Sequence, residues 1–343
     1  MEQALARYLG DHPHRRARVD DGNLHLQRVQ KLRGSENVAR KTYVRLSAGA
    51  ITAGGTLGIL IPPSVMLVVM APVVGVPATH LFAACTIPGL LLAALYCGYT
   101  LIRSYLNPKL GPPLPLEQHA SSYTVVLREL AIGVVPVVVV VFATLVTILM
   151  GIATPTDAAA VGCFVSVVMA IMYGRLTWKG FKRSVFATLE ISSMVLVLVA
   201  AFNFYGAVFS RLGSASMIAE SLLDLPLPPT AMLLVILLLI FLLGWPLEWV
   251  PIVLVVVPIV LPMIKQLEID MLWFTTLVAV CLQTAWLSPP VALSAYFLKG
   301  VVPDWDLKDI NAGMLQFMLL QLAGLLLIIV FPALALWLPS QLF

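Results

Sequence analysis

The segment SAGAITAGGTLGILIPPS, residues 47–64, decides how this chain folds. It lies within an apolar block, residues 46–76, and contains the proline pair Pro62-Pro63 near its end. Two successive prolines remove two backbone N–H donors, and their rings clash with carbonyl groups one turn back in a helix. Within a membrane, backbone freed in this way is tolerated only where protein buries it or where it lines a water-filled cavity. The segment therefore predicts a broken membrane helix, with a simple proline kink as the alternative.

Composition indicates that the rest of the chain is also membrane protein. The chain has 343 residues, of which 60% are hydrophobic and only 11% are charged, whereas soluble domains carry about 25% charged residues. The apolar residues form blocks of about 20, long enough to cross the hydrocarbon core as helices, and not the ~10-residue alternating strands of a barrel. We therefore expect an all-α, multi-pass membrane protein and exclude a soluble domain. The blocks cover approximately residues 46–76, 81–102, 125–150, 157–173, 185–209, 231–264, 272–298 and 312–338.

Positive charge is concentrated in two polar segments. Ten of the 21 Lys and Arg residues fall within residues 1–45, and a second basic cluster occupies the short gap at residues 175–183. The positive-inside rule places both segments on the cytoplasmic side of the membrane. Acidic residues dilute the first segment, so we expect no nucleic-acid binding by it.

A second proline pair, Pro289-Pro290, interrupts the block at residues 272–298. An apolar half-helix follows this pair, as one follows Pro62-Pro63. The first broken block begins on the basic side of the membrane, whereas Lys299 follows the second break, so the two are expected to run in opposite directions. Broken helices in two inverted halves are typical of secondary transporters, in which unwound carbonyl groups coordinate Na⁺ and half-helix N-termini hold anionic groups.

Two further interruptions carry polar residues. In the segment GIATPTD, residues 151–157, we expect Asp157 either to cap a half-helix that begins at Ala158 or to lie on an ion pathway. The segment GWP, residues 244–246, interrupts the block at 231–264, which at 34 residues is too long for one span and short for two. This block therefore predicts a hairpin or a re-entrant element.

At these motifs the sequence resembles the large membrane subunit of the tripartite ATP-independent periplasmic (TRAP) transporters, the DctM-like family. The resemblance rests on residues 47–64, on GIATPTDAAAVG (151–162), on GWPLEW (244–249) and on LQTAWLSPP (282–290), and it spans about residues 40–339. It implies a Na⁺-driven importer of organic anions, typically carboxylates, in the bacterial inner membrane, with an inverted-repeat, elevator-type architecture. It also implies a small membrane subunit and a periplasmic binding protein as partners, and no cofactor besides the coupling ion.

The resemblance also implies where the ion and the substrate bind. Backbone and hydroxyl oxygens of the broken segments would bind Na⁺. Cys281 stands where relatives commonly have Asn, so that a side-chain ligand would be lost, and Ser288 stands where Thr is usual, which keeps the hydroxyl. The expected site residues are Gly55, Thr56, Gly58, Ile61 and Ser64 in one half, and Thr154, Thr156, Asp157, Gln283, Thr284 and Ser288 in the other.

We expect the chain to be divided into four parts. These are a basic cytosolic extension without family resemblance at residues 1–42, the remainder of a first repeat at 43–102, a Pro-rich linker at 103–124 and a second inverted repeat at 125–339. The first repeat has no counterpart of Thr154-Pro155-Thr156, because the corresponding position falls before Met1. We therefore expect an N-terminally truncated first repeat, and a chain that cannot transport alone.

Two functions from other classes are the alternatives. One is an intramembrane enzyme that uses Asp157 and Glu248 around a metal or a lipid substrate. The other is a structural assembly subunit. A carrier would respond to Na⁺ over K⁺, whereas an enzyme of this kind would respond to a divalent metal.

Overall fold

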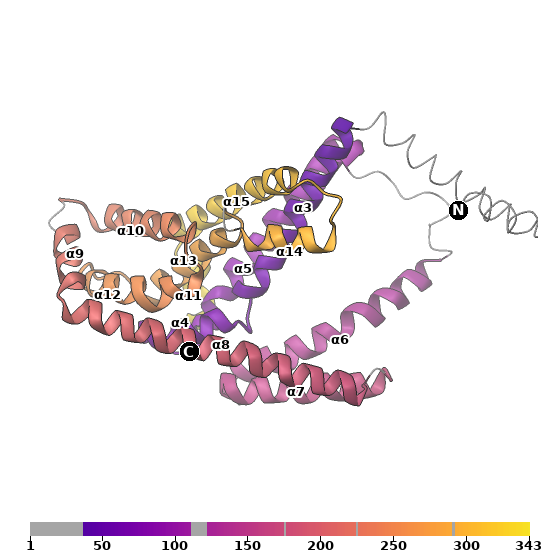
Figure 1. Ribbon diagram of the computed structural model, residues 1–343, viewed down its shortest axis with the longest axis horizontal. Helices are drawn as coiled ribbons and strands as arrows, with labels where there is room; N and C mark the ends of the chain where they lie inside the picture. The colour runs from indigo at the N-terminus through magenta and orange to yellow at the C-terminus, as the bar shows by residue number, and fades with distance from the viewer. Residues whose placement is uncertain (1–36, 111–121, 175, 224–225, 290–291) are drawn as a thin grey trace, which may run out of the picture.

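The computed structural model describes residues 37–110, 122–174, 176–223, 226–289 and 292–343, and every regular element in these ranges is helical (Figure 1). This confirms the expected all-α fold. Short 3₁₀ turns at η1 and η4 and a π-helical turn at η3 join the α-helices. The elements are α3 (Asn37–Leu60), α4 (Val65–Val74), α5 (Ala78–Leu106), η1 (Pro108–Leu110), α6 (Tyr123–Leu149), α7 (Pro155–Met172), α8 (Trp178–Arg211), α9 (Ser214–Leu223), α10 (Pro229–Gly244), α11 (Trp249–Pro251), η3 (Ile252–Val256), α12 (Val257–Gln266), α13 (Met271–Leu282), η4 (Gln283–Trp286), α14 (Leu293–Val301), α15 (Leu307–Val330) and α16 (Ala333–Leu342).

The described helices make the protein multi-pass. Among them, five are long and apolar enough to cross a membrane, and there are up to seven spans if each of two bent helix pairs counts as one. The block at 231–264 divides at residues 245–248 into α10 and the α11–α12 segment, as a hairpin or re-entrant element requires. The segment expected to be a linker at 103–124 starts inside α5 and includes η1, and its residues 111–121 lie outside the described residues.

Helices α3, α5, α13 and α15 form the centre of the molecule, α6 and α7 extend away from it, and α8 runs back along the lower edge to α9 (Figure 1). Helices α3 and α15 lie parallel and in register. Arg45, in the third turn of α3, contacts Asp309 in the first turn of α15, and Thr56, eleven residues further along α3, contacts Gln321, twelve residues further along α15. The first and last long described helices are therefore the most extensively paired elements.

Glycines allow α3 and α15 to approach closely. A Cβ atom on Gly313 of α15 would lie 2.0 Å from the carbonyl oxygen of Arg45, and one on Gly49 of α3 would lie 2.4 Å from Cδ2 of Phe317. Without a hydrophobic driving force between helices in lipid, close backbone contact through small residues stabilises helix pairs. At Gly49 and Gly313, the two helices therefore pack closely because no side chain separates them.

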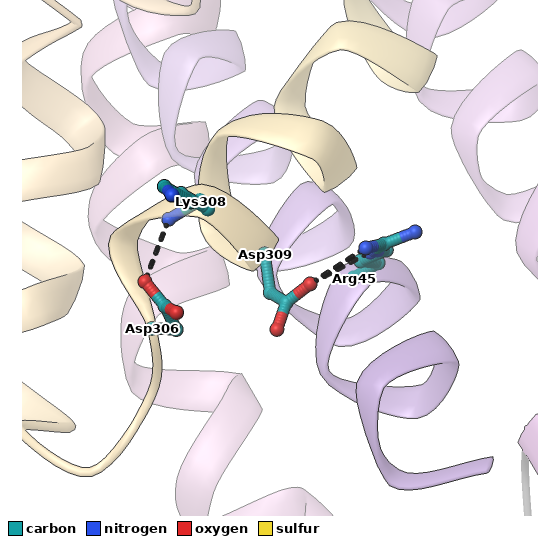
Figure 2. A network of polar contacts seen from close by, with 4 residues as sticks. All are labelled: Arg45, Asp306, Lys308 and Asp309. Carbon is teal, nitrogen blue, oxygen red and sulfur yellow. Dashed lines mark hydrogen bonds and ion pairs between the residues drawn. The ribbon is translucent and has the colours of Figure 1, made fainter. Parts of the chain in front are cut away.

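An ion pair fixes the register of this helix pair. The guanidinium of Arg45 contacts Oδ1 of Asp309 through both Nε and Nη2 at 2.8 Å (Figure 2). Asp309 is only 7% exposed. Asp306 caps the same end of α15 by accepting a hydrogen bond from the backbone N–H of Lys308 at 3.1 Å. A buried carboxylate is costly without a partner, so Asp309 holds Arg45 beside it.

The two broken segments run in opposite directions across this core. Helix α3 runs from the Arg45–Asp309 end toward the first break. After the second break, α14 packs against α3 and α15 and ends at Val301, six residues before α15 begins at the Arg45–Asp309 end. The opposite directions expected from the charge pattern are therefore present in the fold.

Replacing Gly313 by alanine should destabilise the helix pair, because the new Cβ would collide with the backbone of Arg45. Overpacking of this kind costs about 1–3 kcal/mol. Thermal unfolding of the purified protein in detergent measures the effect as a lower Tm. Gly300→Ala is the control, because no atom lies within 4 Å of its Cβ position. Equal melting temperatures for the two variants would contradict the close approach of α3 and α15.

Candidate functional site

The first break lies between α3 and α4, at residues 61–64. The two helices that flank it are bent by 45°. Ser64 caps α4: its hydroxyl accepts a hydrogen bond from the backbone N–H of Leu67 at 3.4 Å and donates to the carbonyl oxygen of Ile59 in the last turn of α3. One hydroxyl thus satisfies backbone groups on both sides of the break, which removes part of the penalty for interrupting a helix in lipid.

The second break begins where α13 tightens into the 3₁₀ turn η4. Thr284 donates to the carbonyl oxygen of Cys281 at 2.6 Å, and Ser288 donates to that of Thr284 at 2.6 Å. The chain is non-helical at residues 287–289, and Pro290 lies outside the described residues. Helix α14 then starts at Leu293. Both proline-marked segments are therefore interrupted, as the sequence predicts.

Gln283 is the residue of the second break with the clearest unused binding capacity. Its side chain is 0% exposed, and neither its amide nitrogen nor its amide oxygen has a hydrogen-bond partner. An unpartnered buried amide costs about 1–3 kcal/mol. Such a group fits a ligand: the Oε1 atom of an amide is a suitable oxygen donor for a cation.

Helix α15 connects the two breaks. Its Gln321 donates from Nε2 to Oγ1 of Thr56 on α3 at 3.4 Å. One turn earlier, Sδ of Met318 lies 3.3 Å from the hydroxyl of Ser288. The structure therefore brings Thr56 and Ser288, predicted from separate motifs, to one face of α15.

A cavity of about 370 Å³ connects the first break with the α6–α7 hairpin. The N-terminal ends of α4 and α7 both reach it, through Ser64 and Thr156. Its wall is mostly apolar and includes Phe82, Val68 and Ile148. Two predicted site residues, Ser64 and Thr156, thus share this cavity.

The role expected for Asp157 as the cap of a half-helix starting at Ala158 is wrong. Helix α7 begins at Pro155, and Thr154 is its N-cap. Asp157 occupies the third helical position and completes a capping box: its carboxylate accepts from the hydroxyl of Thr154 at 2.6 Å and from the backbone N–H of Thr154 at 3.3 Å. The cause is Pro155, whose fixed φ and missing N–H suit the first helical position.

The remaining predicted residues lie on α3 and directly after it. Gly55 and Gly58 belong to regular helix, and nothing lies within 4 Å of a Cβ built on either of them. They form part of an exposed, small-residue face that runs into the break. Ile61, in the break itself, packs against Gly89 of α5, where a Cβ would lie 2.5 Å from its Cγ1 atom.

Gln321 and Gly89 are not among the residues predicted from the sequence. Gln321 is a buried amide within the apolar block at 312–338, and the presence of an amide in such a block was the available signal, which Gln316 shares. Gly89 carried no signal, because its role depends on the approach of Ile61 from another helix. Within the part of the chain that the structure describes, no three His, Cys, Asp or Glu residues are grouped to hold a metal ion. The polar groups at the breaks are hydroxyls, amides and backbone carbonyls.

Comparison with known proteins gives one family. The family described as "Tripartite ATP-independent periplasmic transporter, DctM component" matches residues 36–334. The chain is 28% identical to the C4-dicarboxylate TRAP transporter large permease protein DctM of Rhodobacter capsulatus, over 87% of this chain and 69% of the relative. It is 27% identical to the sialic acid TRAP transporter large permease protein SiaM of Vibrio cholerae, over 94% and 73%. It is 25% identical to the 2,3-diketo-L-gulonate TRAP transporter large permease protein YiaN of Escherichia coli, over 84% and 66%.

Gly89→Ala should disturb the first break, because its methyl group would displace Ile61. We expect a loss of about 1–3 kcal/mol in stability, as for other overpacked sites. Thermal unfolding in detergent measures it. Gly98→Ala on the same helix is the control, since its Cβ position is open, and it should match or exceed the wild type because Ala favours helix over Gly. A Gly89→Ala variant as stable as Gly98→Ala would contradict the packing of Ile61 on α5.

Proposed function

The chain belongs to the DctM component family of tripartite ATP-independent periplasmic transporters, and on that premise we propose that it couples Na⁺ entry to the import of an organic anion across the bacterial inner membrane. The family consists of transporters, so the alternative of an intramembrane enzyme using Asp157 and Glu248 is excluded. Large permeases of this family work with a small membrane subunit and a periplasmic binding protein. We propose the same two partners for this chain.

The observation that carries the proposal is the pair of oppositely directed helix breaks that meet on α15. Interrupted helices release backbone carbonyl groups at membrane depth, and transporters use such groups to coordinate Na⁺. Thr56 and Ser288 lie on this face of α15, next to the first and second breaks. Gln283 adds a buried amide oxygen without a partner. Amide, hydroxyl and carbonyl oxygens together match the preference of a hard cation.

The cavity beside Ser64 and Thr156 is the proposed place for the organic anion. The N-terminal ends of α4 and α7 border it. Helix N-termini favour negative charge, because their backbone N–H groups lack partners within the helix. Asp157 already uses part of this capacity in α7, so α4 is the stronger candidate for contact with a carboxylate. Three relatives are named for C4-dicarboxylate, sialic acid and isethionate. These compounds have an anionic group in common and otherwise differ in structure.

Binding of Na⁺ should raise the melting temperature of the purified chain relative to K⁺ at equal ionic strength. Saturation by a ligand at 100 times its dissociation constant adds about 2.7 kcal/mol, which corresponds to a rise of several degrees. Differential scanning fluorimetry in NaCl and KCl measures this rise. An equal melting temperature in the two salts would contradict Na⁺ coupling, and a response to divalent metal alone would contradict the proposed ion chemistry.

Gln283→Leu should separate ion binding from folding. Removing a buried amide that has no partner should leave the melting temperature in KCl unchanged or higher, because the desolvation penalty disappears. The same change should abolish most of the additional rise in NaCl, because the Oε1 ligand is lost. Ser340→Ala is the control, since Ser340 is an exposed residue of α16. An undiminished Na⁺ response in Gln283→Leu would remove Gln283 from the proposed site.

A further inference from the structure

Three buried polar side chains meet where α3, α5 and α15 pack together. Gln321 of α15 is 0% exposed, and its Nε2 atom donates to Thr56 of α3, while its Oε1 atom has no hydrogen-bond partner. Tyr96 of α5 is also buried: its ring packs edge-on against Phe317, one turn before Gln321 on α15, and its hydroxyl has no hydrogen-bond partner. The amide of Gln321 therefore joins α15 to α3 close to the first break, with the ring of Tyr96 packed one turn away.

A neighbouring Tyr–Gln pair joins the same two helices, α5 and α15, and serves as a comparison. Tyr99 of α5 donates to Oε1 of Gln316 on α15 at 2.8 Å. Both tyrosines contact the ring of Phe317 edge-on, with ring centroids 5.5 Å apart for Tyr96 and 5.4 Å for Tyr99. The Tyr99–Gln316 pair already joins α5 to α15 with a complete hydrogen bond. A second, fully buried pair with an unsatisfied oxygen adds a cost that packing does not explain.

The position of Thr56 indicates what the Tyr96–Gln321 pair does. Thr56 lies four residues before α3 ends at Leu60, in the last turn before the first break. Its hydroxyl also donates to the carbonyl oxygen of Ala53 at 2.8 Å, so its orientation is fixed from two sides. A side chain that holds Thr56 therefore holds the end of the helix from which the break departs.

We propose that Gln321 is a positioning residue for the cation site, which holds Thr56 and the last turn of α3 in the binding geometry with support from Tyr96. The inference rests on the Na⁺ coupling proposed above. Gln321 acts through Thr56, the residue to which its amide nitrogen donates. The effect of losing it is therefore weaker Na⁺ binding in a protein that remains folded.

The test compares the two Tyr–Gln pairs in the full chain. Gln321→Met and Tyr96→Phe remove the polar groups of one pair, and Gln316→Met and Tyr99→Phe remove those of the other, with little change in shape. For each variant, melting temperature is measured against increasing Na⁺ at constant total salt, which yields the half-maximal Na⁺ concentration and the melting temperature in KCl.

We expect Gln321→Met to raise the half-maximal Na⁺ concentration about fivefold, the factor that corresponds to one ordinary hydrogen bond. Tyr96→Phe should change it in the same direction by a smaller factor and is the gentler substitution. Gln316→Met and Tyr99→Phe should leave it unchanged. In a Thr56→Ser background, which keeps the hydroxyl, Gln321→Met should retain its effect.

Each outcome decides between the two proposals. A wild-type chain that does not respond to Na⁺ would overturn Na⁺ coupling and, with it, the role of Gln321. A wild-type chain that responds, together with a Gln321→Met variant of the same half-maximal concentration, would overturn the positioning role alone. The positioning role would also fail if Gln321→Met lowered only the melting temperature in KCl, or if Gln316→Met weakened Na⁺ binding equally.

Discussion

The structure depends on one constraint: backbone groups in hydrocarbon must find partners, because no water is present to bond them. The two breaks satisfy this constraint with side chains from within the same segment. Ser64 bonds backbone groups on both sides of the first break, and Ser288 returns to the carbonyl group of Thr284 in the second. The hydroxyl residues of these motifs therefore support the interrupted backbone from within the chain itself. Proline creates the interruption, and serine or threonine makes it tolerable.

Helix α15 lies beside both breaks. It is parallel to α3, held at its start by the Arg45–Asp309 ion pair and closed onto α3 through Gly49 and Gly313. On this helix, Met318 contacts Ser288 in the second interrupted segment, and Gln321 contacts Thr56 in α3, just before the first break. The geometry of the site is thus set by a continuous helix beside it as well as by the broken helices themselves.

The sequence predicted the helix interruptions but not the position of α15 beside them. Paired prolines in apolar blocks have a strong local effect, so the breaks near Pro62 and Pro289 could be located without a structure. The pairing of α3 with α15 joins residues 264 positions apart, and nothing in the composition of either helix specifies it. In the sequence, Gly313 cannot be distinguished from other glycines in apolar blocks, because its role depends on the contact with Arg45. Asp157 was misassigned for a different reason: Thr154-Pro155 is the stronger start signal, and a carboxylate three residues after the cap completes a capping box.

The pairing of α3 with α15 also bears on the order in which the protein is assembled. Helix α3 leaves the ribosome well before α15, because most of the described helices lie between them in the sequence. Until α15 is synthesised, Arg45 lacks its carboxylate and the face of α3 that carries Gly49 has no neighbour. Contacts between segments so distant in sequence form slowly, because a long loop must close first. The α3–α15 pairing, and with it the proposed cation site, is therefore completed only after α15 has been synthesised.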